Sequence, residues 1–429
     1  MEIYVVKEGD SLWSISRRYG ISEARISEAN GLQTIPYLVI GQALVIPSKE
    51  SIYIVMPGDT IWSISRKYNV SIESIVELNN ITNPNTIHPG MTIRIPAQAK
   101  NYGYIETNGY IEPSTSERET RIVNEVGRYL TFISPFSYQV SSNGSLISIN
   151  DNVILQNARN YSVASLMVIT NYRNGTFDTA LGHEILSNDT VINNLINNVL
   201  GVLRSKGYYG LNIDFERIDP NDRQLYNNFL RKITNMLHQQ NYIVTTALAP
   251  KTSDAQTGAW YGAHDYATHG KIVDFVIIMT YEWGWSGGPP LPVAPLNQVR
   301  AVINYAVSVI PPKKIMMGMP LYGYNWALPY EARGGFAPRV SPQEAIRIAA
   351  RFGVKIEYDI QAQSPFFNYT DQGGVRHIVW FEDARSAQAK YRLASQYGLR
   401  GVSYWVLGEP FPQNWEVLDD MFKIEKVIR

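Results

Sequence analysis

The stretch Tyr209-Gly210-Leu211-Asn212-Ile213-Asp214-Phe215-Glu216 decides how the larger part of this 429-residue chain is interpreted. Apolar and polar residues alternate along it, as in a strand whose two faces meet different surroundings. Its apolar members would pack under helices, while Asn212, Asp214 and Glu216 would point to the opposite, inner face. Polar groups on that face, with Glu216 at the carboxyl-terminal end, are typical of a closed β/α barrel, whose active sites form at that end.

Seven further segments repeat the strand pattern in this part of the chain. They are Tyr104–Ile111, Tyr129–Phe136, Ala164–Thr170, Ile243–Ala249, Phe275–Tyr281, Ile315–Leu321 and Gly401–Val406. Helical patterns fall between them, for example at Asn221–Gln239 and Leu296–Val309. Strands that alternate with helices over about 320 residues predict the α/β class and a (β/α)8 TIM barrel. The gap after Leu321 is too long for one helix, and its own patterns predict a small α+β insertion at about 324–382, forming a wall of the cleft.

An internal repeat occupies the N-terminal part of the chain. Gly9-Asp10-Ser11-Leu12-Trp13-Ser14-Ile15-Ser16-Arg17 recurs 49 positions later as Gly58-Asp59-Thr60-Ile61-Trp62-Ser63-Ile64-Ser65-Arg66. The match runs without a gap to Ile46-Pro47 and Ile95-Pro96, which indicates a duplication. In each unit a short strand leads to a helix-capping Ser or Thr, so we expect two strand–helix–helix–strand modules. The predicted units are 1–48 and 51–97, a linker at 97–103, and the barrel at 104–429.

Composition narrows the classes of function. Lys plus Arg and Asp plus Glu both total 38, which argues against a polyanion such as nucleic acid as a partner. The chain has no cysteine and six scattered histidines, so we expect neither a metal nor any other cofactor. The N-terminus lacks a secretory-signal pattern, and no stretch approaches the roughly 20 apolar residues of a membrane span, so no membrane partner is expected.

Asp214 and Glu216 are the predicted catalytic pair. The two residues lie two positions apart on one strand face, so their carboxyl groups would approach a bound sugar from the same side. In a two-carboxylate glycosidase the two carboxyl groups lie on either side of the scissile bond. The spacing suits one acid and an assistant: Glu216 would protonate the leaving oxygen while the substrate's own 2-acetamido oxygen acts as the nucleophile. Asp214 would hold the acetamido N–H and stabilise the developing positive charge. A buried structural network is the alternative interpretation.

The run resembles the Asp-x-x-Asp-x-Asp-x-Glu motif of glycoside hydrolase family 18, and other landmarks of that family follow in order. Met279-Thr280-Tyr281-Glu282 resembles the sixth-strand motif, which implies that Tyr281 contacts the acetamido carbonyl as a third catalytic residue. Gly318-Met319-Pro320-Leu321-Tyr322-Gly323 resembles the seventh-strand motif, and Trp405 matches the tryptophan beneath the sugar at the cleavage site. The substrate-binding set that the resemblance implies is Asn212, Met279, Glu282, Tyr322 and Trp405.

The sequence also departs from that pattern. Tyr209 and Asn212 replace the first two motif aspartates, so Asp214 lacks an acidic neighbour at position 212 and we expect it to ionise more readily than beside an aspartate there. Glu282 stands where the family has Asp, and Val168-Ile169-Thr170-Asn171 replaces a third-strand Ser-x-Gly-Gly. The predicted acid and its assistant are both retained.

Each repeat resembles the LysM domain, through Gly-Asp-Ser/Thr-Leu/Ile-Trp, a mid-unit Asn and a terminal Ile-Pro. The resemblance implies binding to glycans that contain N-acetylglucosamine, such as peptidoglycan or chitin. We expect the contacts around Gly41 and its double and in the loop that precedes the first helix of each repeat. The predicted contact residues of these loops are Gly9, Asp10, Ser11, Gly58, Asp59 and Thr60. Trp13 and Trp62 are interpreted as core residues.

Paired LysM units ahead of a family 18 barrel resemble the spore cortex-lytic N-acetylglucosaminidases of spore-forming bacteria. That resemblance predicts a monomer that cleaves β-1,4 bonds after N-acetylglucosamine in cortex peptidoglycan fragments, with retention of configuration. It also predicts a place in the coat and cortex region of the spore, reached from the mother-cell cytoplasm without a signal peptide. The alternatives are a chitinase or chito-oligosaccharide hydrolase, and a non-catalytic glycan-binding coat protein.

Overall fold

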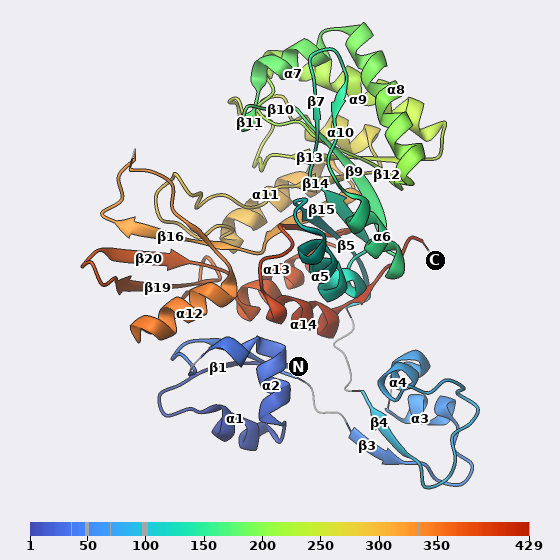
Figure 1. Ribbon diagram of the computed structural model, residues 1–429, viewed down its shortest axis with the longest axis vertical. Coiled ribbons are helices and arrows are strands. Elements are labelled where there is room, and N and C mark those ends of the chain that lie inside the picture. Colours follow the sequence, from blue (N-terminus) through green and yellow to red (C-terminus); the bar gives the residue numbers. More distant parts are fainter. Residues whose placement is uncertain (36, 48–50, 69, 97–101, 333, 429) are drawn as a thin grey trace.

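The computed structural model describes residues 1–35, 37–47, 51–68, 70–96, 102–332 and 334–428. The predicted ends of both repeats, at 48 and 97, and most of the predicted linker at 97–103 lie outside the described residues. Figure 1 shows two small modules from the N-terminal part of the chain and a barrel that carries a separate sheet at its side.

The predicted barrel is confirmed. Eight parallel strands close on themselves, because β12 pairs with β9 as well as with β13. In chain order the barrel strands are β5 (Tyr104–Ile111), β6 (Phe132–Pro135), β9 (Ala164–Thr170), β12 (Gly210–Asp214), β13 (Ile243–Leu248), β14 (Phe275–Ile278), β15 (Ile315–Pro320) and β21 (Gly401–Trp405). Each lies within one of the eight predicted segments.

Helices cover the outside of the barrel, and short strands and 3-10 turns extend its connections (Figure 1). The helices are α5 (Ser116–Val126), α6 (Asn152–Asn160), α7 (Thr179–Leu186), α8 (Asp189–Lys206), α9 (Arg223–His238), α10 (Tyr266–Ile272), α11 (Leu296–Val309), α13 (Ala384–Gln396) and α14 (Pro412–Met421). The short elements are β7 (Tyr138–Val140), β8 (Leu146–Ile147), β10 (Tyr172–Arg173), β11 (Thr176–Phe177), β22 (Lys423–Ile424), η2 (Gly127–Tyr129), η3 (Pro220–Asp222) and η4 (Pro312–Lys314). None of the helices in the described part of the chain is long and apolar enough to cross a membrane.

Strand β12 has the two faces that its alternation predicts. Its apolar side chains join the large buried cluster that the helices cover. Phe215, just past the strand, stacks on Phe229 of α9 with ring centroids 5.7 Å apart. Asn212 points into the barrel instead, where its Nδ2 donates to Thr245 Oγ1 at 2.8 Å. The strand therefore delivers its polar residues to the inside of the barrel.

Between β15 and α13 the chain forms the α+β insertion, drawn in orange and red beside the barrel in Figure 1. Its five strands lie in the order β17 (Arg339–Val340), β16 (Gly323–Leu328), β20 (Arg376–Trp380), β19 (Ser364–Thr370) and β18 (Glu357–Asp359). Their pairing is antiparallel throughout. Helix α12 (Pro342–Phe352) packs against this sheet around a buried cluster of its own, which includes Ile346, Phe367 and Val379. The insertion is thus a second small core attached to the barrel.

Both repeats fold as predicted, each around a small core. The first contains β1 (Glu2–Val5), α1 (Leu12–Tyr19), α2 (Glu23–Asn30), η1 (Leu32–Thr34) and β2 (Ala43–Ile46), and the second contains β3 (Ser51–Ile54), α3 (Ile61–Tyr68), α4 (Ile72–Leu78) and β4 (Thr92–Ile95). The repeated Asn has an internal role in both, because Asn30 donates to the carbonyls of Ile26 and Val45, and Asn79 makes the matching pair of bonds. It ties the second helix to the closing strand.

The interpretation of Trp13 and Trp62 as core residues is wrong. Their side chains are 58% and 60% exposed. Each lies one position off the helical stripe that buries Ile15 in the first repeat and Ile64 in the second. An arginine lies over each ring, with its guanidinium carbon about 5.5 Å from the ring centroid. Both repeats therefore display an aromatic side chain at their surface.

Candidate active site

A cleft of about 800 Å³ opens at the carboxyl-terminal ends of the barrel strands. Aromatic side chains dominate its walls, and two carboxylates from the β12 segment lie in it. Seven of the predicted site residues line it together: Asp214, Glu216, Met279, Tyr281, Glu282, Tyr322 and Trp405. These seven residues lie in β12 and β21 or directly after β12, β14 and β15, so four parts of the barrel end meet at one place.

The backbone of Glu216 is held by a side chain that the sequence did not single out. Asn171, which follows β9, accepts a hydrogen bond from the Glu216 N–H through Oδ1 at 3.0 Å. Its Nδ2 donates to the Glu216 carbonyl oxygen at 2.8 Å. Asn171 is fully buried, so this pair of bonds fixes where the Glu216 side chain begins.

Among the described residues, the carboxylate of Glu216 has one direct hydrogen-bond partner. Trp260, in the loop between β13 and α10, donates its Nε1–H to Glu216 Oε2 at 2.8 Å. The same loop carries His264, whose Nδ1 accepts from the Ala249 N–H at 2.8 Å. The other ring nitrogen, Nε2, must then carry the proton and donate to the Phe215 carbonyl at 3.0 Å. Burial lowers the pKa of His264 to about 4, which keeps its imidazole neutral.

Both carboxyl groups of the pair resist ionisation. Burial raises the pKa of Glu216 to about 7, against the opposing effects of the Trp260 N–H and the Arg217 charge. Burial also holds the pKa of Asp214 well above its usual range, and the charge of Glu216 adds to the effect. Desolvation and the charge of Glu216 therefore keep the pKa of Asp214 raised even without an acidic neighbour at position 212. At neutral pH the pair retains a proton.

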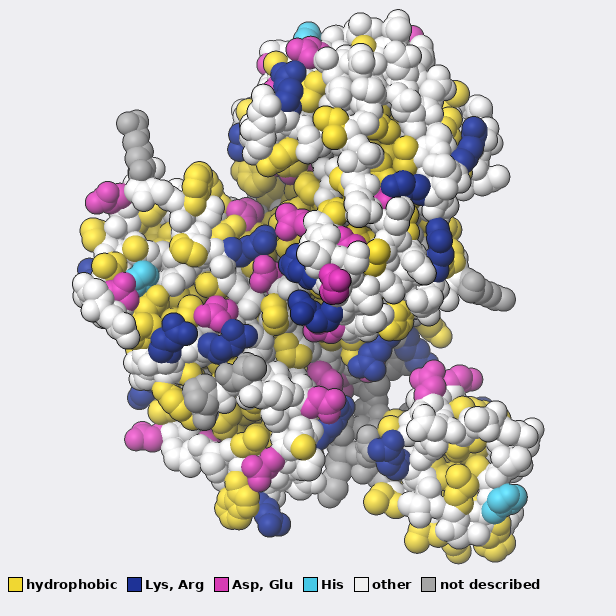
Figure 2. All heavy atoms as spheres, viewed as in Figure 1, with side chains coloured by type: hydrophobic (Ala, Val, Ile, Leu, Met, Phe, Trp, Pro, Cys, Tyr) yellow, Lys and Arg dark blue, Asp and Glu magenta, His cyan; other side chains and the backbone are white. Residues whose placement is uncertain are grey.

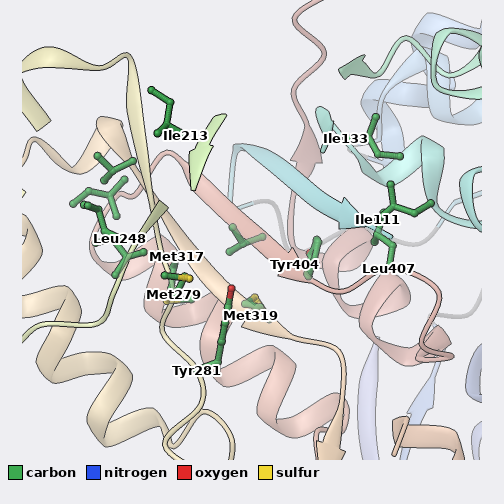
Figure 3. Packing of buried hydrophobic residues seen from close by; sticks show 14 of the residues in the cluster. Ile111, Ile133, Ile213, Leu248, Met279, Tyr281, Met317, Met319, Tyr404 and Leu407 are labelled. Atoms are coloured by element: carbon green, nitrogen blue, oxygen red, sulfur yellow. The ribbon is translucent and has the colours of Figure 1, made fainter. Parts of the chain in front are cut away.

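Two polar groups of the cleft have no partner in the described part of the chain. Oδ1 of Asp214 is buried without a hydrogen bond. None of the described residues bonds to the Tyr281 hydroxyl, whose pKa burial raises well above its usual range, so it remains an O–H donor. Figure 3 shows Tyr281 among Met279, Met317 and Met319 of the buried cluster, a packing that fixes the ring. One free acceptor and one free donor in a desolvated cleft are suited to the two sides of an amide.

The remaining lining residues shape the walls. Tyr322 and Tyr324 both donate their hydroxyls to Glu282 Oε1, the second at 3.1 Å. Burial raises the pKa of Glu282, whose backbone has a positive φ of 69°. Because Tyr324 belongs to β16, the insertion supplies part of the wall, as the sequence predicts. Trp405 packs edge-on against Phe136, with centroids 4.9 Å apart, and presents its ring to the cleft.

Asn212 is the exception among the predicted substrate contacts. It is fully buried and does not line the cleft. Its Oδ1 accepts from the Tyr110 hydroxyl at 2.9 Å and its Nδ2 donates to Thr245. The geometry gives Asn212 a place beneath the site and no direct contact with a ligand. Among the described residues, no cluster of three or more His, Asp or Glu side chains could hold a metal ion.

The polar residues predicted to bind glycan in the repeats have internal partners. Asp10 Oδ2 accepts from the Tyr4 hydroxyl at 2.6 Å and from the Lys7 N–H at 2.7 Å, and Asp59 makes the matching bonds. Ser11 and Thr60 cap the helices that follow. Gly9 and Gly58, with φ of 80° and 91°, have open space around them. In these loops the carboxylates are already hydrogen-bonded within the repeat, and the open backbone at the glycines is what remains available to a ligand.

Comparison with known proteins agrees with this geometry. The model of Glycosyl hydrolases family 18 matches residues 106–409, and the LysM domain model matches residues 4–47 and 53–96. The chain is 48% identical to the cortical fragment-lytic enzyme of Bacillus subtilis, over 99% of each chain. It is also similar to the crystal structures of the spore cortex-lytic enzyme SleL of Bacillus megaterium and of Bacillus cereus. The first shares 43% identity with a TM-score of 0.85 over 99% of each chain, and the second 40% and 0.85 over 99% and 98%. The chain belongs to glycosyl hydrolase family 18 and carries two LysM domains ahead of its catalytic barrel.

Proposed function

We propose that this enzyme hydrolyses the β-1,4 bond that follows N-acetylglucosamine in cortex peptidoglycan fragments, by substrate-assisted catalysis with retention of configuration. The observation that carries the proposal is Asp214 Oδ1 and the Tyr281 hydroxyl, both without a hydrogen-bond partner among the described residues, in the aromatic cleft that also holds Glu216. Its substrate class comes from the relatives, which are named for their action on cortex fragments or spore cortex.

Bond cleavage begins from a protonated Glu216. In the free enzyme burial keeps a proton on the carboxyl pair. An acetamido N–H that donates to Asp214 favours the ionised form of that residue, which leaves the proton on Glu216. Glu216 gives this proton to the glycosidic oxygen, and the leaving sugar departs with the bonding electron pair.

The acetamido group of the substrate completes the step. Its carbonyl oxygen attacks the anomeric carbon and forms a cyclic oxazolinium ion. This ion takes the place of the covalent glycosyl-enzyme intermediate of retaining two-carboxylate enzymes. Tyr281 donates to the acetamido oxygen and orients it, and the Asp214 carboxylate stabilises the positive charge on the ring. Water then attacks the anomeric carbon, and the bond from that carbon to the acetamido oxygen breaks with its electron pair returning to the acetamido group. Glu216, now ionised, removes a proton from the attacking water and regains its starting state.

Analysis of product ends tests the substrate class. Purified cortex fragments would be digested and the new reducing ends identified by mass spectrometry, with the Glu216→Gln chain as the blank. N-acetylglucosamine ends are expected, and muramic acid ends would exclude the proposal. Faster turnover of chito-oligosaccharides than of cortex fragments would favour the chitinase alternative. Absence of turnover on every acetamido glycan would favour a binding protein.

The substitution Trp260→Phe tests whether the Trp260 hydrogen bond controls the pKa of Glu216. Loss of the Nε1–H removes a bond that favours the ionised Glu216, so its pKa rises. The protonated acid is the active form, and activity falls as pH rises through that pKa, about 7 in the unaltered chain. We expect the alkaline limb of kcat/KM to move upward by roughly half a unit to one unit, the equivalent of one hydrogen bond. Trp283→Phe, in the same cleft, is the matched control and should leave the limb in place.

The names of the same relatives also support a location in the spore. We propose that the enzyme works on glycan in the coat and cortex region of the spore. We also propose that the enzyme acts as a monomer, because Asp214, Glu216 and Tyr281 already lie in one cleft of this chain and the proposed mechanism needs no residue from a second copy. Size-exclusion chromatography with light scattering checks this, and a dimer at working concentration would contradict it.

A further inference from the structure

The first repeat shares its hydrophobic packing with the catalytic domain. Val39, in the loop before β2, belongs to the buried cluster of the insertion, with Ile346 and Phe367. Ala43 and Val45 of β2 belong to the large cluster of the barrel. Strand β2 and helix α2 pack against α14, and Figure 1 shows this repeat directly beneath α12 and α14. One face of the first repeat is therefore buried against the insertion and the barrel, which together form the catalytic unit.

Buried polar contacts fix this docking. Gln413 of α14 donates to Asn30 Oδ1 at 2.8 Å and to the Ala43 carbonyl at 2.7 Å. Gln343 of α12 donates to the Asn30 carbonyl, also at 2.8 Å. The three amide residues are at most 3% exposed. Because a buried polar group is costly unless bonded, the contacts specify one arrangement of repeat, insertion and barrel.

The second repeat presents the same surface to solvent. At the positions that match Val39, Ala43 and Val45 it carries His88, Thr92 and Arg94, all exposed. In the described part of the chain, its buried cluster draws on residues 53–95 alone. Figure 2 shows it as a lobe of its own, with apolar side chains across the visible face. Within the described residues, duplication thus produced one module that packs into the catalytic domain and one, called undocked here, whose buried core is entirely its own.

Docking also occupies a predicted glycan loop of the first repeat. The Ile356 N–H donates to the Ile40 carbonyl at 2.9 Å, and a Cβ on Gly41 would lie 1.9 Å from Ile356 O. Arg385 donates to the Gly41 carbonyl at 3.2 Å. Gly90, the double of Gly41, has nothing within 4 Å of that position. The loop is part of an interface in the first repeat and open in the second.

The open loops of the second repeat have the composition of a sugar-binding surface. Met56 and Trp62 are 57% and 60% exposed, and Met91 is 37% exposed. Backbone bonds between Val55 and residues 90 and 91 bring the two loops together. Exposed apolar groups on so small a module mark a binding site, and they suit the C–H faces of sugars, while open backbone at Gly58 and Gly90 suits acetamido groups.

We propose that the repeats have diverged in function. The first is a structural part of the catalytic unit, and the second attaches the chain to insoluble glycan that contains N-acetylglucosamine, through residues 56–62 and 88–91. The choice of glycan as ligand rests on the proposed function. Attachment through an undocked module raises the concentration of glycan near the cleft while it leaves the cleft itself unchanged.

Matched substitutions at equivalent positions test the binding half. The probe is purified insoluble cortex peptidoglycan, sedimented with the full chain carrying Glu216→Gln so that the glycan stays intact. Met56→Glu with Trp62→Ala is compared with Lys7→Glu and Trp13→Ala, which alter the same two exposed positions of the first repeat. We expect the dissociation constant to rise about tenfold or more for the second-repeat pair and to change less than about twofold for the first-repeat pair.

Equal losses for both pairs, or unchanged binding of the second-repeat pair, would overturn the proposal. Hydrolysis is measured separately, on soluble fragments with the active chain. A chain that fails to cleave any acetamido glycan, yet shows the expected difference in sedimentation, would refute the proposed function and leave the division between the repeats standing.

The structural half is tested by exchanging residues between the repeats. Val45→Arg gives the first repeat the residue of the second, and Arg94→Val is the reverse change at the exposed position. Val45→Arg should lower the thermal unfolding midpoint by several degrees and reduce turnover of soluble fragments, since it buries a charge at the interface. Arg94→Val, which removes a hydrogen bond to the Leu78 carbonyl at the module surface, should leave turnover of soluble fragments unchanged. Gln413→Ala, which removes two interface bonds without adding a charge, should lower the midpoint in the same direction. Wild-type stability of both interface variants would refute a structural role.

Discussion

Replacing Glu216 with glutamine is expected to lower kcat on soluble cortex fragments by about 10³-fold, within the 10²–10⁴-fold range of general acid–base catalysis. Glutamine keeps the shape of the side chain and can still accept the Trp260 hydrogen bond. It cannot give a proton to the leaving oxygen, nor take one from water. Initial rates on a defined soluble fragment, with KM determined alongside, measure the effect. Full activity of the variant would refute the assigned role.

The thermal unfolding midpoint of the Glu216→Gln chain shows whether the variant folds, because we expect the midpoint to stay the same or to rise while the activity falls. The pKa of Glu216 is raised on folding to about 7, so the stability that protonation contributes is present at low pH and is lost as pH rises through that value. Glutamine has no proton to lose. At pH 8 the variant should therefore unfold at the same temperature as the unaltered chain or a few degrees higher. A large drop in midpoint would mean that the lost activity reports unfolding.

Asp214→Asn is the second substitution with a large expected effect. Asparagine can accept the acetamido N–H but carries no charge to stabilise the oxazolinium ion, so we expect kcat to fall by about 10²–10³-fold. KM should change far less, because the shape of the cleft and the unpaired Tyr281 hydroxyl remain. Kinetics on substrates with a less basic acetamido oxygen, such as a fluorinated analogue, provide the check. If Asp214 acts through the acetamido group, the loss of kcat for the variant on the analogue should be smaller than the product of the two separate losses, one from the substitution and one from the analogue.

Glu282→Gln separates the assistant from an ordinary buried acid. Glu282 lines the same cleft, but two tyrosine hydroxyls already bond its Oε1. Loss of its charge should act mainly on KM and should leave most of kcat. If Glu282→Gln and Asp214→Asn reduced kcat equally, the special role of Asp214 would be contradicted.

Much of the fold could be predicted because its determinants are local. The alternation along β12 is visible within eight consecutive residues, and it correctly separates the buried outer face from the polar inner face. The duplication is visible as a direct match, and both modules have the predicted order of strands and helices. Trp13 and Trp62 could have been placed correctly by the same reasoning, since they fall off the apolar stripe of their helices.

The support of the catalytic acid could not be predicted from local patterns. Asn171 lies 45 residues before Glu216, at a position where the sequence showed only a departure from the family motif. Trp260 lies 44 residues after it, in a loop without periodicity. These contacts depend on how two connections fold over the end of the barrel. A polar residue directly after a buried strand is the available signal, and it identifies Asn171 but not Trp260.

The raised pKa of Asp214 could not be predicted for a related reason. The sequence shows which charges are neighbours along a strand, and the loss of an acid at position 212 indicates only that Asp214 ionises more readily than it would beside an aspartate. Desolvation depends on what covers the group from every side, and that covering is assembled from distant strands. Here it is the larger effect, since Asp214 is 5% exposed and its Oδ1 is unpaired.

The docking of the first repeat has a consequence for how the chain matures. Its own core, which includes Ile15 and Ile26, is complete once residue 46 has been made. Helices α13 and α14 cover β2, and they begin only at Ala384 and Pro412, far later in the chain. At roughly 5–20 residues per second on the ribosome, Ala43 and Val45 are exposed to water for roughly 20–70 seconds before α14 is made. The folded module therefore presents an apolar face throughout that interval, and this face is one that a chaperone would shield in the nascent chain.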